Sequence, residues 1–264
     1  MDRKDQLTNV RKMALAESTR RGRIVAITSG KGGVGKSNIA LNLSIALTQK
    51  GNSVILFDAD PHLANVNVLI GKTSSYTLAD VVFGDKDLSD ITLEDSSGLK
   101  IVSASSGTND LAGLEDGIKD RFFQEIYRCG HTHDFIIIDT SAGLSETIID
   151  FAVRADEVVV VTTPEPAAVS DAYALVKVLF GMNGKIQFKT LINIVNSKDE
   201  AEEVFERFSL VMGHFLNMET EYLGFVIEDK HVRSAVIEQN PFLHAFPESQ
   251  ASKCIYRIAQ RMSA

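Results

Sequence analysis

The sequence predicts an α/β fold, in which a single doubly wound, mostly parallel sheet carries helices on both of its faces. Two observations lead to this prediction. Short runs rich in β-branched residues alternate with stretches of helical character from residue 23 onward, an order that is typical of a parallel sheet. Several of these runs, such as FIII and VVVV, are apolar at consecutive positions, which indicates strands that helices cover on both sides.

The individual elements follow in chain order. The β-branched runs predict strands at 23–29, 53–58, 99–105, 135–139, 157–163, 188–195 and 222–227. The stretches between them predict helices at 36–50, 77–83, 118–129, 145–154, 167–182, 199–216, 230–238 and 249–262. The acidic segment 85–98, DKDLSDITLEDSSG, is expected to form a surface loop. No linker rich in Pro, Ser or Gly and no internal repeat interrupts residues 23–264, so we expect them to form one domain.

Composition narrows the class of protein. The chain of 264 residues is long enough to bury a large core, and its lone cysteines, Cys129 and Cys254, show no metal-site spacing. The charged N-terminus has no apolar stretch typical of a signal peptide, and no run approaches 18 apolar residues. We therefore expect a protein of the reducing cytoplasm.

Charge is distributed unevenly along the chain. The first 23 residues hold seven basic and three acidic side chains, a net charge of +4, so that the rest of the chain carries −12 of the total of −8. An acidic body of this kind argues against nucleic acid as a partner. Within residues 1–22, Leu7, Val10 and Ala14 share one helical face. These residues are expected to form a separate short helix, either docked on its own domain or available to a partner.

A phosphate-binding loop follows the first expected strand. Residues 30–37, GKGGVGKS, match the pattern G-x-x-x-x-G-K-[ST] and lead into an expected helix, the context that this motif requires. Glycines let backbone N–H groups surround phosphates, and the helix N-terminus adds its positive end. Lys36 is expected to contact the β- and γ-phosphates, and the hydroxyl of Ser37 to bind Mg²⁺. The expected nucleotide contacts are Gly30, Lys31, Gly32, Gly33, Val34, Gly35, Lys36, Ser37 and Asn38.

Carboxylates follow two further strands. Asp58 and Asp60 stand at the end of VILFDAD, and Asp139 ends FIIID, where a Walker B aspartate holds Mg²⁺. Ligands of open α/β sheets gather at the carboxyl ends of strands. We therefore expect these three side chains to converge on the loop, although a single Asp at a strand end is more often a turn or cap residue.

Together these residues resemble the MinD/ParA superfamily of deviant Walker A ATPases. The resemblance rests on GKGGVGKS with its early Lys31, on DAD followed by PHLANVNVLIG, and on DTSAG followed by TTPEPAAVSDAYALVK, and it covers nearly all of residues 23–262. It implies an ATP-dependent homodimer in which Lys31 reaches the nucleotide of the other subunit. It further implies that Asp60 positions the attacking water, that Lys31, Lys36 and Asp60 are catalytic, that Ser37, Asp58 and Asp139 hold Mg²⁺, and that Glu165 lies at the dimer face.

One branch of the superfamily is the most similar. DQLTNVR, residues 5–11, resembles the D-Q-A-x-x-L-R element of the FlhG/FleN (YlxH) ATPases that govern flagellar number and placement. Asp5, Gln6 and Arg11 match this element, whereas Leu7 and Val10 depart from it. The resemblance implies that this helix stimulates an FlhF-type GTPase, and that flagellar switch proteins or transcription proteins are further candidate partners. LINIVNSKDEAEEVF also resembles this branch, and Asn193 within it is the candidate residue for reading adenine.

Other functions remain open from the sequence. A ParA- or MinD-type role in DNA partitioning or division-site positioning is the main alternative, and an electron or iron–sulfur carrier is a third. Members of the family contact the membrane through a C-terminal amphipathic helix. The last expected helix here places Ala251, Cys254, Ile255, Ile258 and Met262 on one face. Because that face lacks Phe, Trp and Leu, we expect it to pack on the sheet, while a peripheral contact with the inner face of the cell membrane stays open.

Overall fold

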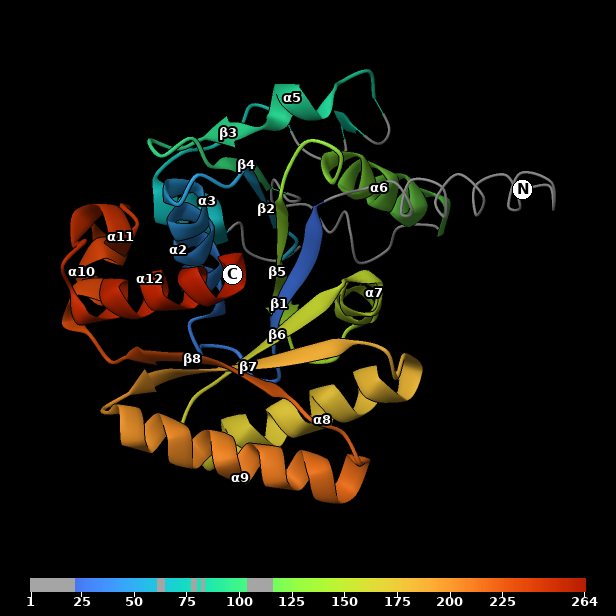
Figure 1. The fold of residues 1–264 in the computed structure, drawn as a ribbon. Helices are drawn as coiled ribbons and strands as arrows, with labels where there is room; N and C mark the ends of the chain where they lie inside the picture. The colour runs from blue at the N-terminus through green and yellow to red at the C-terminus, as the bar shows by residue number, and fades with distance from the viewer. Residues whose placement is uncertain (1–21, 61–64, 77–79, 82–83, 104–115) are drawn as a thin grey trace.

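One sheet organises the protein. The structure, a computed structural model, describes residues 22–60, 65–76, 80–81, 84–103 and 116–264. Its strands follow the order β3-β4-β2-β5-β1-β6-β7-β8 (Figure 1). They span Arg23–Ser29 (β1), Val54–Asp58 (β2), Leu93–Glu94 (β3), Lys100–Ser103 (β4), Phe135–Ala142 (β5), Glu157–Thr162 (β6), Gln187–Val195 (β7) and Glu221–Ile227 (β8). Neighbouring strands are parallel except for the antiparallel pair β3 and β4.

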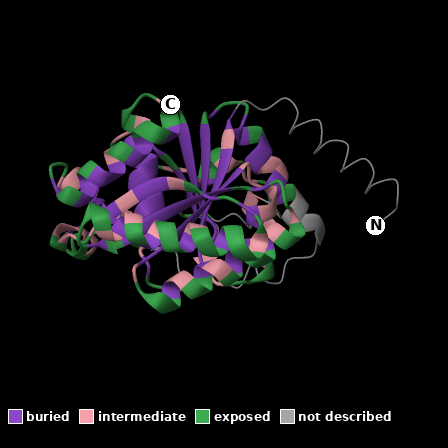
Figure 2. Ribbon diagram, turned by 60° about the horizontal axis from the view of Figure 1, so that its bottom comes forward, coloured by how far each residue is buried: buried purple, intermediate pink, exposed green. Residues whose placement is uncertain are grey.

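Helices cover both faces of the sheet. They are α2 (Lys36–Gln49), α3 (Asn65–Ile70), α5 (Leu88–Ile91), α6 (Asp116–Cys129), α7 (Glu146–Arg154), α8 (Pro166–Met182), α9 (Lys198–Leu216), α10 (Lys230–Ile237), α11 (Phe242–Ala245) and α12 (Gln250–Ser263). The apolar side chains of α2 and α10 to α12 pack on one face, and those of α6 to α9 pack on the other. Figure 2 shows the buried strands between helices whose outer sides are exposed. This arrangement confirms the predicted fold class.

The acidic segment 85–98 differs from the expected loop. It contains the short helix α5 and the two-residue strand β3, which pairs with β4 at the edge of the sheet. Asp87 begins α5 with a reciprocal cap, in which Asp87 and Asp90 each accept a hydrogen bond from the other residue's backbone. Local capping and one edge pairing are weak sequence signals, which explains why the prediction missed them. The helix expected at 77–83 lies largely outside the described residues.

The C-terminal helix packs against the domain. Ser249 caps α12, and the face formed by Ala251, Cys254, Ile255, Ile258 and Met262 is buried in the core shared with α2 and β8. This burial agrees with the expectation of packing on the sheet. Within the described residues, no helix combines the length and hydrophobicity needed to cross a bilayer.

Candidate functional site

The phosphate-binding loop connects β1 to α2. β1 ends at Ser29, and α2 begins at Lys36, so the N-terminus of a 14-residue helix opens directly behind the loop. Gly33 and Gly35 have φ values of 82° and 86°. Residues with a side chain rarely adopt this left-handed conformation, which explains the glycines of the motif.

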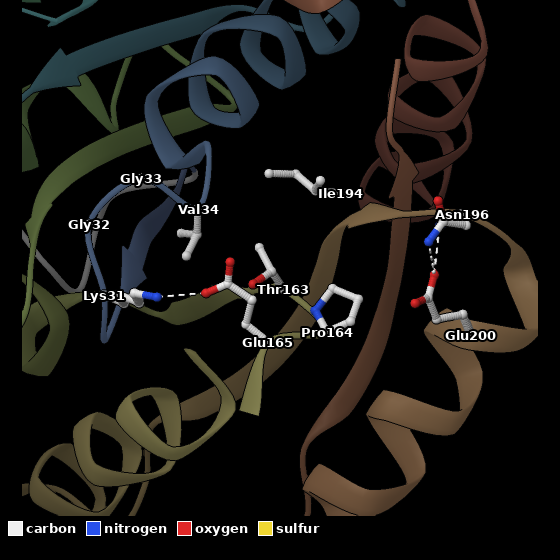
Figure 3. A pocket seen from close by; sticks show the side chains of 10 residues that line it. All are labelled: Lys31, Gly32, Gly33, Val34, Thr163, Pro164, Glu165, Ile194, Asn196 and Glu200. Atoms are coloured by element: carbon white, nitrogen blue, oxygen red, sulfur yellow. Dashed lines mark hydrogen bonds and ion pairs between the residues drawn. The ribbon is translucent and has the colours of Figure 1, made fainter. Parts of the chain in front are cut away.

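Two cavities adjoin the loop. The larger, of about 510 Å³, is lined by Ser29, Gly32, Gly33, Val34, Gly35, Lys36, Ser37, Asn38, Asp60, Val68, Leu69, Ala142 and Val236. The smaller, of about 310 Å³, is lined by Lys31, Gly32, Gly33, Val34, Thr163, Pro164, Glu165, Ile194, Asn196 and Glu200 (Figure 3). Lys36, Ser37 and Asp60 therefore share one cavity, whereas Lys31 lines the other.

Strand register aligns two of the three expected carboxylates. β5 lies between β1 and β2 in the sheet, and Asp58 of β2 is the register partner of Asp139 of β5. Both side chains are buried. Asp60 follows β2 and lines the larger cavity, and its backbone N–H donates to Asp58 Oδ1 at 3.3 Å. The order of strands therefore brings the carboxyl ends of β2 and β5 together beside the loop, as expected for this type of sheet.

Lys36 and Asp139 form a buried ion pair. Lys36 Nζ lies 3.1 Å from Asp139 Oδ1, and the hydroxyl of Ser37 also contacts Asp139. Within the part of the chain that the structure describes, Asp139 Oδ2 is buried and has no hydrogen-bond partner. A buried carboxylate oxygen without a donor is costly unless a ligand satisfies it. This oxygen fits a role as acceptor toward Mg²⁺ or its water.

The surroundings of Asp58 and Asp139 disfavour the negatively charged form of each carboxylate. Burial, reinforced by the negative charge of Asp139, raises the pKa of Asp58 to about 8. Burial also raises the pKa of Asp139, although the nearby Lys36 and the hydrogen bond from Ser37 oppose this effect. Asp58 and Asp139 are buried at the carboxyl ends of neighbouring strands, and hard oxygen ligands of this kind suit Mg²⁺, which binds through one or two carboxylates and the substrate phosphates. The residues present therefore fit this ion, which would neutralise the phosphate charge.

Lys31 pairs with Glu165 at the smaller cavity. Its Nζ lies 2.6 Å from Glu165 Oε2, and the two side chains retain 41% and 65% of their exposure (Figure 3). The hydrogen bond and the charge of Glu165 raise the pKa of Lys31. Glu165 directly precedes α8, within the PEP segment that follows β6. An exposed pair of this kind contributes little to folding and is easily exchanged for another partner.

Asn193 lies beneath the loop and lines neither cavity. Its side chain is buried, and Nδ2 donates to the backbone carbonyl oxygen of Val34 at 2.7 Å. The next residue, Ile194, lines the smaller cavity, where Figure 3 shows it across from Thr163 and Pro164. The amide that was expected to read adenine thus contacts the loop backbone in this structure.

Several contacts around the site were not predicted from the sequence. Val68 and Leu69 of α3 and Val236 of α10 line the larger cavity, and the sequence reading did not anticipate Glu165 as the partner of Lys31. All of them come from elements that only the folded chain brings together. Asp5, Gln6 and Arg11 lie outside the described residues.

Known proteins resemble this chain in both sequence and fold. Residues 20–263 match the family ParA, described as NUBPL iron-transfer P-loop NTPase. The chain is 38% identical over 241 residues to "Antiactivator FleN" of Pseudomonas aeruginosa, which covers 91% of this chain and 86% of the relative. It is 33% identical over 260 residues to "Flagellum site-determining protein YlxH" of Helicobacter pylori, and this match covers 97% of this chain and 87% of the relative.

A solved structure has the same fold. The septum site-determining protein MinD complexed with Mg-ADP, from Pyrococcus horikoshii, matches with a TM-score of 0.73 at 25% sequence identity. The match covers 91% of this chain and 96% of the other.

Proposed function

Because this chain belongs to the ParA/MinD family of P-loop ATPases, we propose that it is an ATP-switched regulator of flagellar number and placement. In this proposal the protein is a monomer without ATP and a homodimer with ATP, and slow hydrolysis returns it to the monomer. The names of the two relatives, an antiactivator and a flagellum site-determining protein, support the flagellar role. A nucleotide shifts such an equilibrium only by its differential affinity for the two states.

The observation that carries the dimer proposal is the separation of the two lysines. Lys36 lines the cavity that also contains Ser37 and Asp60, whereas Lys31 lines the other cavity beside the loop. Lys31 therefore lies outside the lining of the cavity that we assign to the phosphates, and its exposed side chain is available to the nucleotide of a second subunit. A lysine that arrives from a second subunit would stabilise the negative charge of phosphoryl transfer and make hydrolysis depend on dimerisation.

The surface around the loop also fits a second copy. Val68 of α3, Leu144 after β5 and Ile237 of α10 are large apolar residues that are 55%, 46% and 73% exposed. Val68 lines the larger cavity, Ile237 directly follows its lining residue Val236, and Leu144 stands two positions after its lining residue Ala142. Exposed apolar residues beside a cavity are typical of a surface that a partner covers.

Within the site, each polar side chain receives a role. Lys36 and the loop amides bind the phosphates, Ser37, Asp58 and Asp139 hold Mg²⁺, and Asp60, which lines the cavity, orients the attacking water. Magnesium, when bound, would neutralise part of the phosphate charge. Phosphoryl transfer requires mainly positioning and electrostatic stabilisation, which these side chains supply.

An iron-carrying role, as in the description of the matched family, gains no support from the cysteines. Cys129 and Cys254 are free and buried, and burial raises the pKa of both thiols. Among the described residues, no three His, Cys, Asp or Glu side chains are grouped so that they could hold a metal ion by themselves.

The partner that we propose for residues 1–22 is an FlhF-type GTPase. The family match begins at residue 20, which supports the division into an N-terminal extension and an ATPase domain of residues 23–264. We propose that Asp5, Gln6 and Arg11 contact the GTPase. This contact would link the ATP-dependent state of this protein to GTP hydrolysis by its partner.

The test measures GTP hydrolysis by a purified FlhF-type GTPase in the presence of this protein. Full-length protein is expected to stimulate hydrolysis, whereas protein lacking residues 1–22 should not, even though it still hydrolyses ATP. Arg11→Ala should lose most of the stimulation, while Asn9→Ala, at a position that the family element leaves free, should retain it. Stimulation that survives the deletion would contradict the proposed role of this segment.

A further inference from the structure

A bulge near the end of β7 sets the position of Asn193. The register between β7 and β8 shifts between Asn193 and Val195, and the residue between them, Ile194, has a φ of 58°. β-Branched residues are strained in this left-handed region, and such strain persists only where the surrounding structure imposes it. Bulges often redirect side chains next to functional sites.

The bulge sends consecutive side chains in different directions. Ile194 is 40% exposed and lines the cavity that contains Lys31, whereas Asn193 is 7% exposed and faces the phosphate-binding loop. The Asn193 amide touches the loop at two consecutive residues. It donates to the carbonyl oxygen of Val34 at 2.7 Å, and a Cβ atom on Gly35 would lie only 2.4 Å from Asn193 Nδ2.

This contact determines the orientation of one peptide plane. The peptide bond between Val34 and Gly35 is planar and trans, so its carbonyl and its N–H point in opposite directions. A carbonyl held by Asn193 therefore turns the N–H of Gly35 away from Asn193. Gly35 lines the larger cavity, together with Lys36 and Ser37, and phosphate loops bind their ligand through such backbone N–H groups.

We propose that Asn193 is a positioning residue for the phosphate-binding loop: its hydrogen bond to Val34 directs the N–H of Gly35 toward the phosphates of the nucleotide. This inference rests on the ATP site described above and is independent of the flagellar and dimer proposals. It assigns Asn193 a role that acts on the triphosphate, whichever base is attached. A residue that reads adenine would instead act on the base.

Binding of three ligands separates these two roles. The dissociation constants of ATP, GTP and inorganic tripolyphosphate, each with Mg²⁺, are measured by calorimetry for wild type and for Asn193→Leu, which removes the donor while adding no charge. Losing one hydrogen bond to a buried carbonyl corresponds to about tenfold in affinity. We expect all three ligands to lose affinity by about this common factor, so that the ratio between ATP and GTP does not change.

A spectroscopic readout reports on the peptide plane itself. In ¹⁵N-glycine-labelled wild type, tripolyphosphate should shift the amide resonance of Gly35, and this shift should be absent or much smaller in Asn193→Leu. Loss of stability alone would not remove the response of a single amide. Asn193→Ala serves as the second variant if the leucine does not fold, because it also removes the donor and introduces no steric clash.

Asn183 provides the matched control. Its Nδ2 also donates to a backbone carbonyl, that of Val153, at 3.3 Å, but it stands at the C-terminal end of α8, outside the residues that line either cavity. Asn183→Leu should leave all three affinities unchanged. The proposal is overturned if the Asn193 variants lose affinity for ATP alone and bind tripolyphosphate as wild type does, or if no affinity changes.

Discussion

The ammonium group of Lys36 lies 3.1 Å from Asp139 Oδ1, and this ion pair joins residues that are 103 positions apart in the chain. Both side chains are buried, and they come from the start of α2 and from β5. Without a nucleotide, the aspartate neutralises the lysine that the phosphates would otherwise engage. In the site that we propose, nucleotide binding would exchange one partner of Lys36 for another, and it would free Asp139 to act on Mg²⁺.

Substitution of either member of this pair should produce a different defect. Lys36→Ala removes a charged donor to the phosphates, so we expect ATP affinity to fall by about 30-fold or more. Asp139→Asn keeps the lysine, so ATP should still bind within a few-fold of wild type, while the hydrolysis rate falls by about 100-fold because the carboxylate no longer supports Mg²⁺. Calorimetry and phosphate release measure the two quantities. An Asp139→Asn protein that hydrolyses ATP at the wild-type rate would rule out the metal role.

Lys31→Ala should separate ATP binding from dimerisation. Because Lys31 lies outside the cavity that contains Lys36, its loss should leave ATP affinity measurable but abolish the ATP-dependent dimer in light scattering after size exclusion. Lys253→Ala is the matched control, since it removes a lysine of similar exposure that is also paired with a glutamate but lines neither cavity. That variant should still dimerise. If Lys31→Ala forms the dimer as wild type does, the lysine does not act on a second subunit.

Asp60→Ala should trap the ATP-bound state. Asp60 lines the larger cavity next to the loop, and removal of a group that orients the attacking water lowers the rate by about 100-fold or more. The protein should therefore stay dimeric with ATP for much longer than wild type, and the bound nucleotide extracted from it should be ATP and not ADP. A variant that remains monomeric with saturating ATP would contradict this role.

Asp95 should make part of the stability depend on pH. Burial opposes ionisation of Asp95, but hydrogen bonds from His244, from the Ser97 hydroxyl and from the amides of Ser97 and Leu99 outweigh it and hold the pKa below its ordinary value. A lowered pKa means that this stability is present above the ordinary pKa of about 4 and is lost as pH falls through the folded-state value. Asp95→Asn should thus lower the free energy of unfolding by about 2 kcal/mol at pH 7, and by much less once the pH is below the folded-state pKa of Asp95.

Thermal unfolding across this pH range measures the effect. Asp85→Asn is the control, because Asp85 is exposed in the same acidic segment and the substitution removes the same formal charge. It should leave the unfolding temperature nearly unchanged at every pH. A constant difference between Asp95→Asn and wild type from pH 7 to pH 3 would show that ionisation of Asp95 is not the cause.

The pattern of apolar residues predicts most of the strands and helices, and the elements that it misses are all short. The apolar runs located seven strands, because a strand covered on both faces needs consecutive apolar residues. The pattern missed β3, α3, α5 and α11, which have two to six residues and are too short to show a period in the sequence. The small apolar residues of the last helix predicted that it packs on the sheet. Its actual position against α2 and β8 depends on the order of strands in the sheet.

The sequence predicted the candidate nucleotide site, because the phosphate loop is eight contiguous residues and the three carboxylates stand at the ends of two apolar runs. How these groups face one another depends on the folded chain. It placed Lys31 and Lys36 in different cavities, paired Lys31 with Glu165, and put Asn193 against a loop 159 residues away. The physical reason is that these relationships come from strand order, register and one strained bulge, which arise from long-range packing and leave no local pattern in the chain.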